Sequence, residues 1–148
     1  MINNTFISQN PFKKEYNSAG WIFADYRNKL DGTDKNIIIY GHNRRDGSMF
    51  NNLHKFRKDH DLFKNAILKV RNGEETKTYR PLSIQITNDN WIYMDLDDMT
   101  IDEAVTVIYE NSDYNLIADY DENSHIITLM TCEYTEEGNR LFTYWISE

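Results

Sequence analysis

Two apolar runs near the C-terminus constrain the fold of this chain more than any other feature. Residues 126–131 are aliphatic and β-branched, and residues 141–146 mix aliphatic and aromatic side chains. Both compositions are typical of buried strands. The polar residues between them include a glycine, so the two runs predict a hairpin centred near Glu136. In such a hairpin Cys132 and Arg140 are cross-strand partners, with Cβ atoms about 5 Å apart.

Cys132 is the only cysteine of the chain, which excludes an internal disulfide. A lone cysteine in a strand is often a small buried hydrophobe. A guanidinium fixed beside the sulfur would instead lower the thiol pKa and favour the thiolate. A third predicted strand, Asn36–Tyr40, leads into Gly41 and His42. A cysteine and a histidine at two strand ends, with an arginine, suit acyl transfer through a thioester.

Three motifs resemble the sortase family. Residues 128–132, TLMTC, resemble the TLxTC signature of sortases, and Arg140 stands where that family keeps its arginine. Residues 39–43, IYGHN, followed by DGSMF at 46–50, resemble the histidine segment of class B sortases. Residues 21–28, WIFADYRN, resemble the segment that class B members carry upstream of that histidine. The resemblance extends from about residue 10 to the C-terminus.

The resemblance implies a role for each candidate site residue. Cys132 is the expected nucleophile, His42 the general acid that protonates the leaving amine, and Arg140 the group that holds substrate carbonyls and stabilises the oxyanion. Thr131 and Asn43 are the expected substrate-binding residues. Thr131 either positions the nucleophile or packs within its strand, and Asn43 orients His42 by hydrogen bonding.

The implied function is that of a class B cysteine transpeptidase. Such an enzyme cleaves a C-terminal sorting signal after threonine, holds the product as a thioacyl enzyme, and passes it to an amine of peptidoglycan or of a pilin. The family works at the extracytoplasmic face of the bacterial cell membrane. One alternative is a sortase-like protein that binds or scaffolds without efficient catalysis. Another is a plain Cys/His peptidase that releases its product to water.

Composition narrows the class of protein and partner. The formal charge of -8 argues against nucleic acid, which requires a basic footprint. No run of 18 apolar residues exists, so we expect no membrane anchor in this chain. No cofactor or metal is expected, because the four histidines match no compact ligand pattern. Three of them, His54, His60 and His125, are expected to be ordinary surface or core histidines.

The expected fold is mainly β, a sortase-like barrel with short helices, either complete or without its first strand. Residues 1–148 are expected to form a single catalytic domain, with residues 1–17 as a loop or partial leader and a strand at 20–26. Local signals mark further elements, namely a helix from an N-cap at Ser48 through Leu53 and Phe56, a short strand at 66–70, a hairpin at Asn72-Gly73, an edge position or bulge at Pro81, and a helix from the Thr100–Glu103 capping box to Asn111.

Overall fold

The computed structural model describes residues 5–6, 22–25, 27–29, 33–43, 50–88, 98–132 and 138–148, and for residues 5, 6, 23, 72 and 132 it describes the backbone alone. The strands are β1 (Thr5–Phe6), β2 (Phe23–Ala24), β3 (Asn36–Tyr40), β4 (Leu68–Asn72), β5 (Glu75–Asn88), β6 (Tyr114–Asn115), β7 (Ile126–Cys132) and β8 (Asn139–Ser147). The helices are the 3-10 turn η1 (Phe50–Asn52), α1 (Leu53–Lys58), α2 (His60–Lys64) and α3 (Ile101–Asn111).

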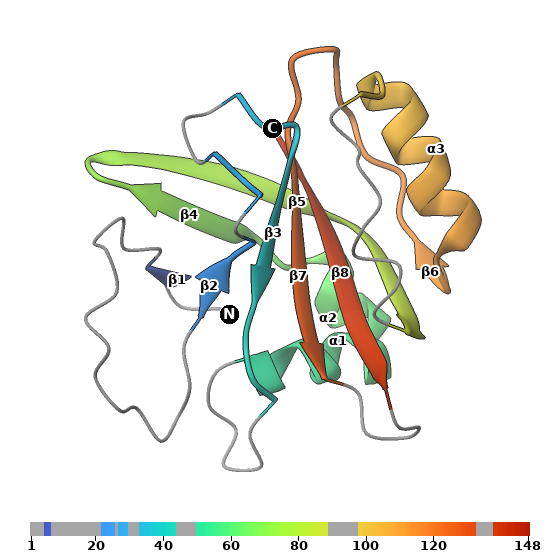
Figure 1. Cartoon of the computed structure of the whole chain (residues 1–148). Helices are drawn as coiled ribbons and strands as arrows, with labels where there is room; N and C mark the ends of the chain where they lie inside the picture. The colour runs from blue at the N-terminus through green and yellow to red at the C-terminus, as the bar shows by residue number, and fades with distance from the viewer. Residues whose placement is uncertain are drawn as a thin grey trace.

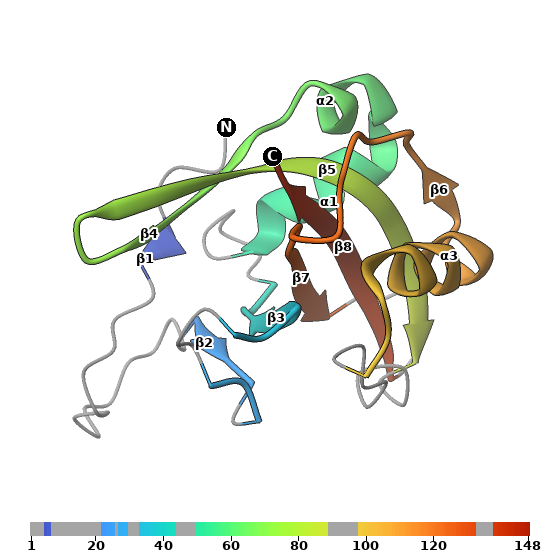
Figure 2. The same cartoon turned by 90° about the horizontal axis from the view of Figure 1, so that it is seen from above.

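One sheet carries these strands in the order β1-β4-β5-β8-β7-β3-β2, and β6 pairs with β5. Figures 1 and 2 show that the sheet curls, with the long strand β5 bending around one side. The mainly β fold with a curled, barrel-like sheet and short helices is therefore confirmed. The expectation that the first barrel strand is missing stays a prediction.

The hairpin of β7 and β8 is the centre of the sheet. Its pairing is antiparallel, and the register runs from Ile126 opposite Ile146 to Cys132 opposite Arg140. The register predicted from the sequence is confirmed, whereas its predicted centre at Glu136 lies outside the described residues. On the other side of β7, strand β3 pairs in parallel. Its predicted bounds, Asn36–Tyr40, are also confirmed.

Alternating side chains of the sheet contribute to two separate hydrophobic cores, one on each face. On one face Ile127, Leu129 and Trp145 pack with the aromatic side chains of η1, α1 and α2. On the other face Ile126, Met130, Phe142 and Tyr144 pack toward α3 and its buried Ile108. Figure 2 shows the two groups of helices on different sides of the sheet. This alternation follows from the period of two along a strand, and it assigns each position of β7 and β8 to one face.

Several local structures that the sequence predicts are present. The capping box holds, because the Glu103 N–H donates to Thr100 Oγ1 at 3.2 Å and the Thr100 N–H donates to Glu103 Oε2 at 3.0 Å. Gly73 has a positive φ of 62° in the β4–β5 turn. The β5–β8 register shifts between Pro81 and Ser83, as expected of a proline within a long strand.

Other expectations need correction. The loop expected over residues 1–17 is wrong at Thr5–Phe6, which pair in parallel with β4. Helix α1 starts at Leu53 after a 3-10 turn and has Asn52 as its N-cap, while Ser48 lies outside the described residues. The strand expected at 66–70 lies at Leu68–Asn72 instead, and the expected strand at 20–26 is described only at Phe23–Ala24. Within the described residues, no helix has both the length and the apolar character needed to cross a membrane.

Candidate active site

Cys132 and Arg140 end neighbouring strands and lie directly opposite each other. Arg140 also pairs with Thr87 of β5, so it stands between two strands at the same end of the sheet. Its side chain is half-buried, and its Nη1 donates to the carbonyl of Asn139 at 3.1 Å. Because the side chain of Cys132 lies outside the described atoms, the contact between thiol and guanidinium stays a prediction.

His42 approaches the same end of the sheet from the other side of β7. Tyr40 is the partner of Met130 in the parallel β3–β7 pair, and the Gly41 N–H donates to the Met130 carbonyl at 3.1 Å. Tyr40 precedes His42 by two residues and Met130 precedes Cys132 by two, so the same register, continued by two residues, would set His42 level with Cys132. Adjacent strands are about 4.8 Å apart. The His42 side chain is exposed, so it is accessible to a ligand in solution.

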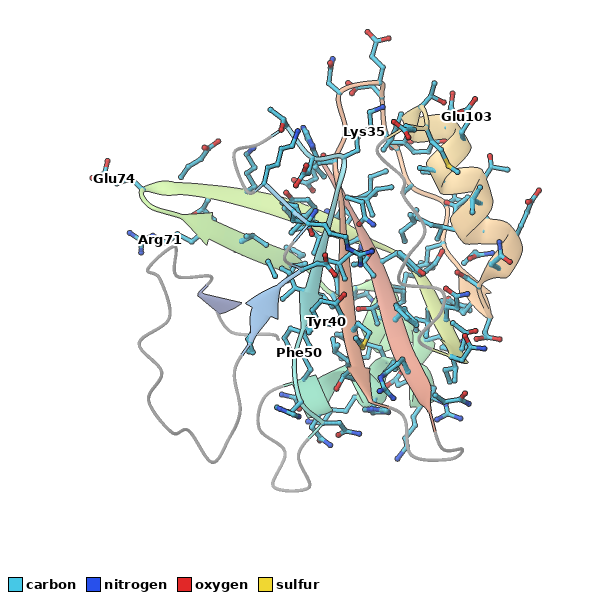
Figure 3. All side chains as sticks on the ribbon, viewed as in Figure 1. Lys35, Tyr40, Phe50, Arg71, Glu74 and Glu103 are labelled. Carbon is cyan, nitrogen blue, oxygen red and sulfur yellow. The ribbon has the colours of Figure 1, made fainter. Side chains whose placement is uncertain are left out.

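The backbone of the His42 segment is held from both sides. The Phe50 N–H donates to the His42 carbonyl at 2.9 Å, and the Phe50 side chain is only 2% exposed. A Cβ placed on Gly41 would lie 2.6 Å from Cγ and Cδ2 of the Phe50 ring. Glycine is therefore required before His42 because the aromatic ring occupies the space of a side chain. Figure 3 labels Phe50 and also Tyr40, the last residue of β3, which directly precedes Gly41.

Asn43 connects the histidine segment to helix α1. Its Oδ1 accepts from Asn51 Nδ2 at 2.6 Å, and its Nδ2 lies 2.9 Å from His54 Nε2. The expected bond from Asn43 to His42 stays a prediction. His54 was expected to be an ordinary histidine, and the structure places it against the neighbour of the candidate general acid. The spacing of Asn43 and His54 carries no recognisable motif, so this contact is visible only in the fold.

Thr131 lies on the opposite side of β7 from Met130. It pairs with Leu141, is 1% exposed, and its Oγ1 has no hydrogen-bond partner within the described part of the chain. Of its two expected roles, this placement corresponds to packing within the strand. A contact between Thr131 and a substrate stays a prediction.

The segment upstream of the histidine protects the free edge of β3. After Ala24 the backbone pairing ends with the Asp25 N–H donating to the Ile38 carbonyl at 2.8 Å. The Asn28 side chain then replaces a strand, because its Oδ1 accepts from the Ile38 N–H at 2.9 Å and its Nδ2 donates to the Asn36 carbonyl at 2.8 Å. This satisfies backbone groups that would otherwise lack partners and fixes the strand that carries His42.

No metal site accompanies these residues in the part of the chain that the structure describes, where no three His, Cys, Asp or Glu side chains gather closely enough to hold an ion. The arrangement of the described backbone brings a cysteine, a histidine and an arginine to one end of three adjacent strands. That set can carry out acyl transfer, with a thiolate nucleophile, an imidazole proton donor and a cationic partner for the oxyanion.

Comparison with known proteins places the chain in a family. The sortase domain model matches residues 2–144. Sortase B of Staphylococcus aureus is 31% identical over 144 residues, which cover 88% of this chain and 55% of the relative. Sortase B of Listeria monocytogenes is 29% identical over 134 residues, covering 88% of this chain and 54% of the relative. The chain thus spans about half the length of the curated relatives it matches.

The structural comparison agrees. The crystal structure of Clostridium perfringens sortase B matches with a TM-score of 0.78 at 25% identity, covering 98% of this chain and 82% of that one. The similarity therefore extends over nearly the whole chain, the central sheet included. The chain belongs to the sortase family, and the relatives it matches are class B sortases.

Proposed function

We propose that this chain is the catalytic domain of a class B cysteine transpeptidase, formed by residues 1–148. It cleaves a C-terminal sorting signal after threonine and transfers the new C-terminus to an amine of peptidoglycan or of a pilin. The observation that carries the proposal is the register of β7, which pairs Cys132 with Arg140 on one side and pairs Met130, two residues before Cys132, with Tyr40, two residues before His42, on the other. Family membership supports the same chemistry.

The proposed reaction has two halves. In the first, the Cys132 thiolate attacks the threonine carbonyl carbon, a C–S bond forms, and the scissile C–N bond breaks. His42, as imidazolium, gives its proton to the leaving amine, and Arg140 stabilises the negative oxygen of the tetrahedral intermediate. In the second, the acceptor amine forms a new C–N bond as the C–S bond breaks. Imidazole takes the proton of the amine, and the thiolate is regenerated.

Solved relatives support the kinds of substrate. A Staphylococcus aureus sortase B that is 28% identical to this chain was solved as a complex with substrate, and a sortase B of the same identity was solved with triglycine. A peptide acyl donor and an amine acceptor are therefore reasonable for this chain. We propose that it acts at the extracytoplasmic face of the cell membrane, where the family works.

The test is mass spectrometry of the intact protein after incubation with a library of sorting peptides. We expect an acyl adduct on Cys132, which triglycine then removes as a transpeptidation product. Cys132→Ala, with a normal melting temperature, must form none. Release of the acyl group to water even with excess triglycine would indicate the peptidase alternative. Binding of peptide without any adduct would indicate the scaffold alternative, and either result would overturn the proposal.

A further inference from the structure

A tyrosine, a carboxylate and a guanidinium form a chain of hydrogen bonds at the end of β3 that bears His42. The Tyr40 hydroxyl donates to Asp25 Oδ2 at 2.5 Å. Arg27 donates from Nε to Asp25 Oδ1 at 2.7 Å and from Nη2 to Oδ2 at 2.9 Å, and its N–H donates to Oδ1 at 2.9 Å. Asp25 is 6% exposed, so its carboxylate is satisfied by these donors rather than by bulk water.

The protonation states of Asp25 and Tyr40 do not change near neutral pH. Hydrogen bonds from Arg27, joined by that from Tyr40, hold the pKa of Asp25 well below its usual range despite its burial. Burial, reinforced by the bond to Asp25, raises the pKa of Tyr40. Asp25 is therefore an acceptor and Tyr40 a donor at every pH near neutrality. A bond to an ionised partner is among the stronger hydrogen bonds in proteins.

The position of Tyr40 connects this network to the candidate catalytic residues. Tyr40 packs at the edge of the second core and is the cross-strand partner of Met130, two residues before Cys132. It also precedes His42 by two residues, and the intervening Gly41 stays bonded to Met130. Because a strand has a period of two, Tyr40 is the residue of β3 nearest to His42 that belongs to the same face.

The carboxylate of this network comes from the segment that follows β2, not from the segment that carries His42. Asp25 directly follows β2, and its own N–H is bonded to Ile38 of β3. Asp25 therefore lies opposite Ile38, and its bond to the Tyr40 hydroxyl runs diagonally along β3 to the residue whose backbone is paired with Phe23. Without this bond, the end of β3 would be held by its backbone pairing with Phe23 of β2, by its parallel neighbour β7 and by the Phe50 contact, and the Tyr40 side chain would have no anchor to the segment after β2.

From this geometry we propose that Tyr40 and Asp25 are positioning residues for catalysis, which hold the end of β3 so that His42 stays in register with Cys132. The proposal rests on the proposed function. It adds that the upstream motif residue Asp25 acts on the reaction through Tyr40, without touching the substrate. A displacement of about 1 Å of a catalytic group can cost roughly 100-fold in rate.

The chain offers a matched control. Tyr120 also donates its hydroxyl to an aspartate, Asp102 Oδ1 at 2.7 Å, but this pair lies at α3 on the second core face. Tyr40→Phe and Tyr120→Phe each delete one oxygen and one tyrosine–aspartate bond. A purely structural role predicts similar consequences for both variants, whereas a positioning role predicts a loss of acylation in Tyr40→Phe alone.

The experiment measures single-turnover acylation by a sorting peptide that wild type accepts, normalised to the fraction of protein that can be acylated. We expect Tyr40→Phe to acylate about 10-fold more slowly and Tyr120→Phe to match wild type. Proton NMR of the histidine Cε1–H groups, with His42 assigned from His42→Ala, should show a shifted His42 signal in Tyr40→Phe and unshifted His60 and His125 signals.

A double-variant cycle completes the test. Asp25→Asn should slow acylation to a similar degree, and the double variant Tyr40→Phe/Asp25→Asn should be no slower than the worse single variant. Wild-type rates in Tyr40→Phe, or equal losses in Tyr40→Phe and Tyr120→Phe, would overturn the positioning role. If Tyr40→Phe does not fold, Arg27→Met replaces it, with the same expected shift of His42. A wild-type chain that forms no adduct with any peptide would instead refute the proposed function.

Discussion

Cys132 at the end of β7 and Arg140 near the start of β8 are directly paired across the central hairpin of the sheet. The pairing is a property of the backbone register, and every residue of β7 back to Ile126 shares it. A slip by one residue would send Arg140 to the other face. The register that builds the two cores therefore also determines which residue faces the candidate nucleophile.

Replacing Arg140 by lysine should slow acylation by roughly 100-fold, the scale of losing an oxyanion donor. Lysine keeps the charge but lacks the planar fork that bonds two acceptors at once. Stopped-flow or quenched acylation with a sorting peptide measures the rate. The control is Arg80→Lys, since Arg80 is an exposed arginine of β5 paired with Glu148. Wild-type acylation in Arg140→Lys would show that the guanidinium geometry is not used.

His42→Ala should lose turnover by roughly 10²–10⁴-fold, because it removes the proposed proton donor to the leaving amine. The ring of His60 stacks on that of Tyr114 with 3.8 Å between the ring centroids, and His125 Nδ1 lies 3.0 Å from the Asp34 carbonyl oxygen. Alanine at either of these two positions should leave the pH–rate profile of peptide cleavage unchanged. A large loss of cleavage rate in one of these variants, with His42→Ala still active, would mean that another histidine is the proton donor.

His54→Leu should lower acylation about fivefold, the equivalent of one net hydrogen bond of roughly 1 kcal/mol. This departs from the sequence-based expectation, because His54 Nε2 lies 2.9 Å from Asn43 Nδ2 beside His42. His54→Gln offers an amide oxygen to the same partner and should retain most of the rate. Equal rates for the leucine and glutamine variants would argue that the bond has no role.

Gly41→Ala should destabilise the protein by about 1–3 kcal/mol, the usual cost of forcing extra volume into a packed site. The new methyl group would meet the Phe50 ring at 2.6 Å. Equilibrium urea unfolding measures the change, and the loss should be smaller when Gly41→Ala is made in a Phe50→Leu background. An equal loss in both backgrounds would place the strain elsewhere.

Asp25 should contribute to acid stability. Its folded pKa is depressed, so its contribution is fully present above the unfolded value of about 3.9 and is lost as the pH falls through the lower folded value. Urea unfolding of wild type between pH 7 and pH 3 should show stability falling below about pH 4. Asp25→Asn should be less stable at pH 7 and should show a shallower acid loss. Parallel pH curves for the two proteins would contradict this assignment.

Much of the local structure was determined by the sequence alone. The β-branched run before Cys132, the Thr100–Glu103 capping box, the turn at Gly73 and the shift near Pro81 are short-range effects of side-chain shape and backbone freedom. The short separation of Cys132 and Arg140 along the chain, with one turn between two strands, was enough to predict their pairing. These features form because neighbouring residues impose them.

Tertiary structure decided which distant segments meet. The parallel pairing of β3 with β7 brings His42 toward Cys132, and no spacing in the chain encodes that neighbour. The same holds for Asn43 with His54, Gly41 with Phe50, and Tyr40 with Asp25. These contacts depend on how the sheet curls and on which helix covers each face. The curl and the placement of the helices follow from burying both apolar faces of the sheet at once, not from any local preference.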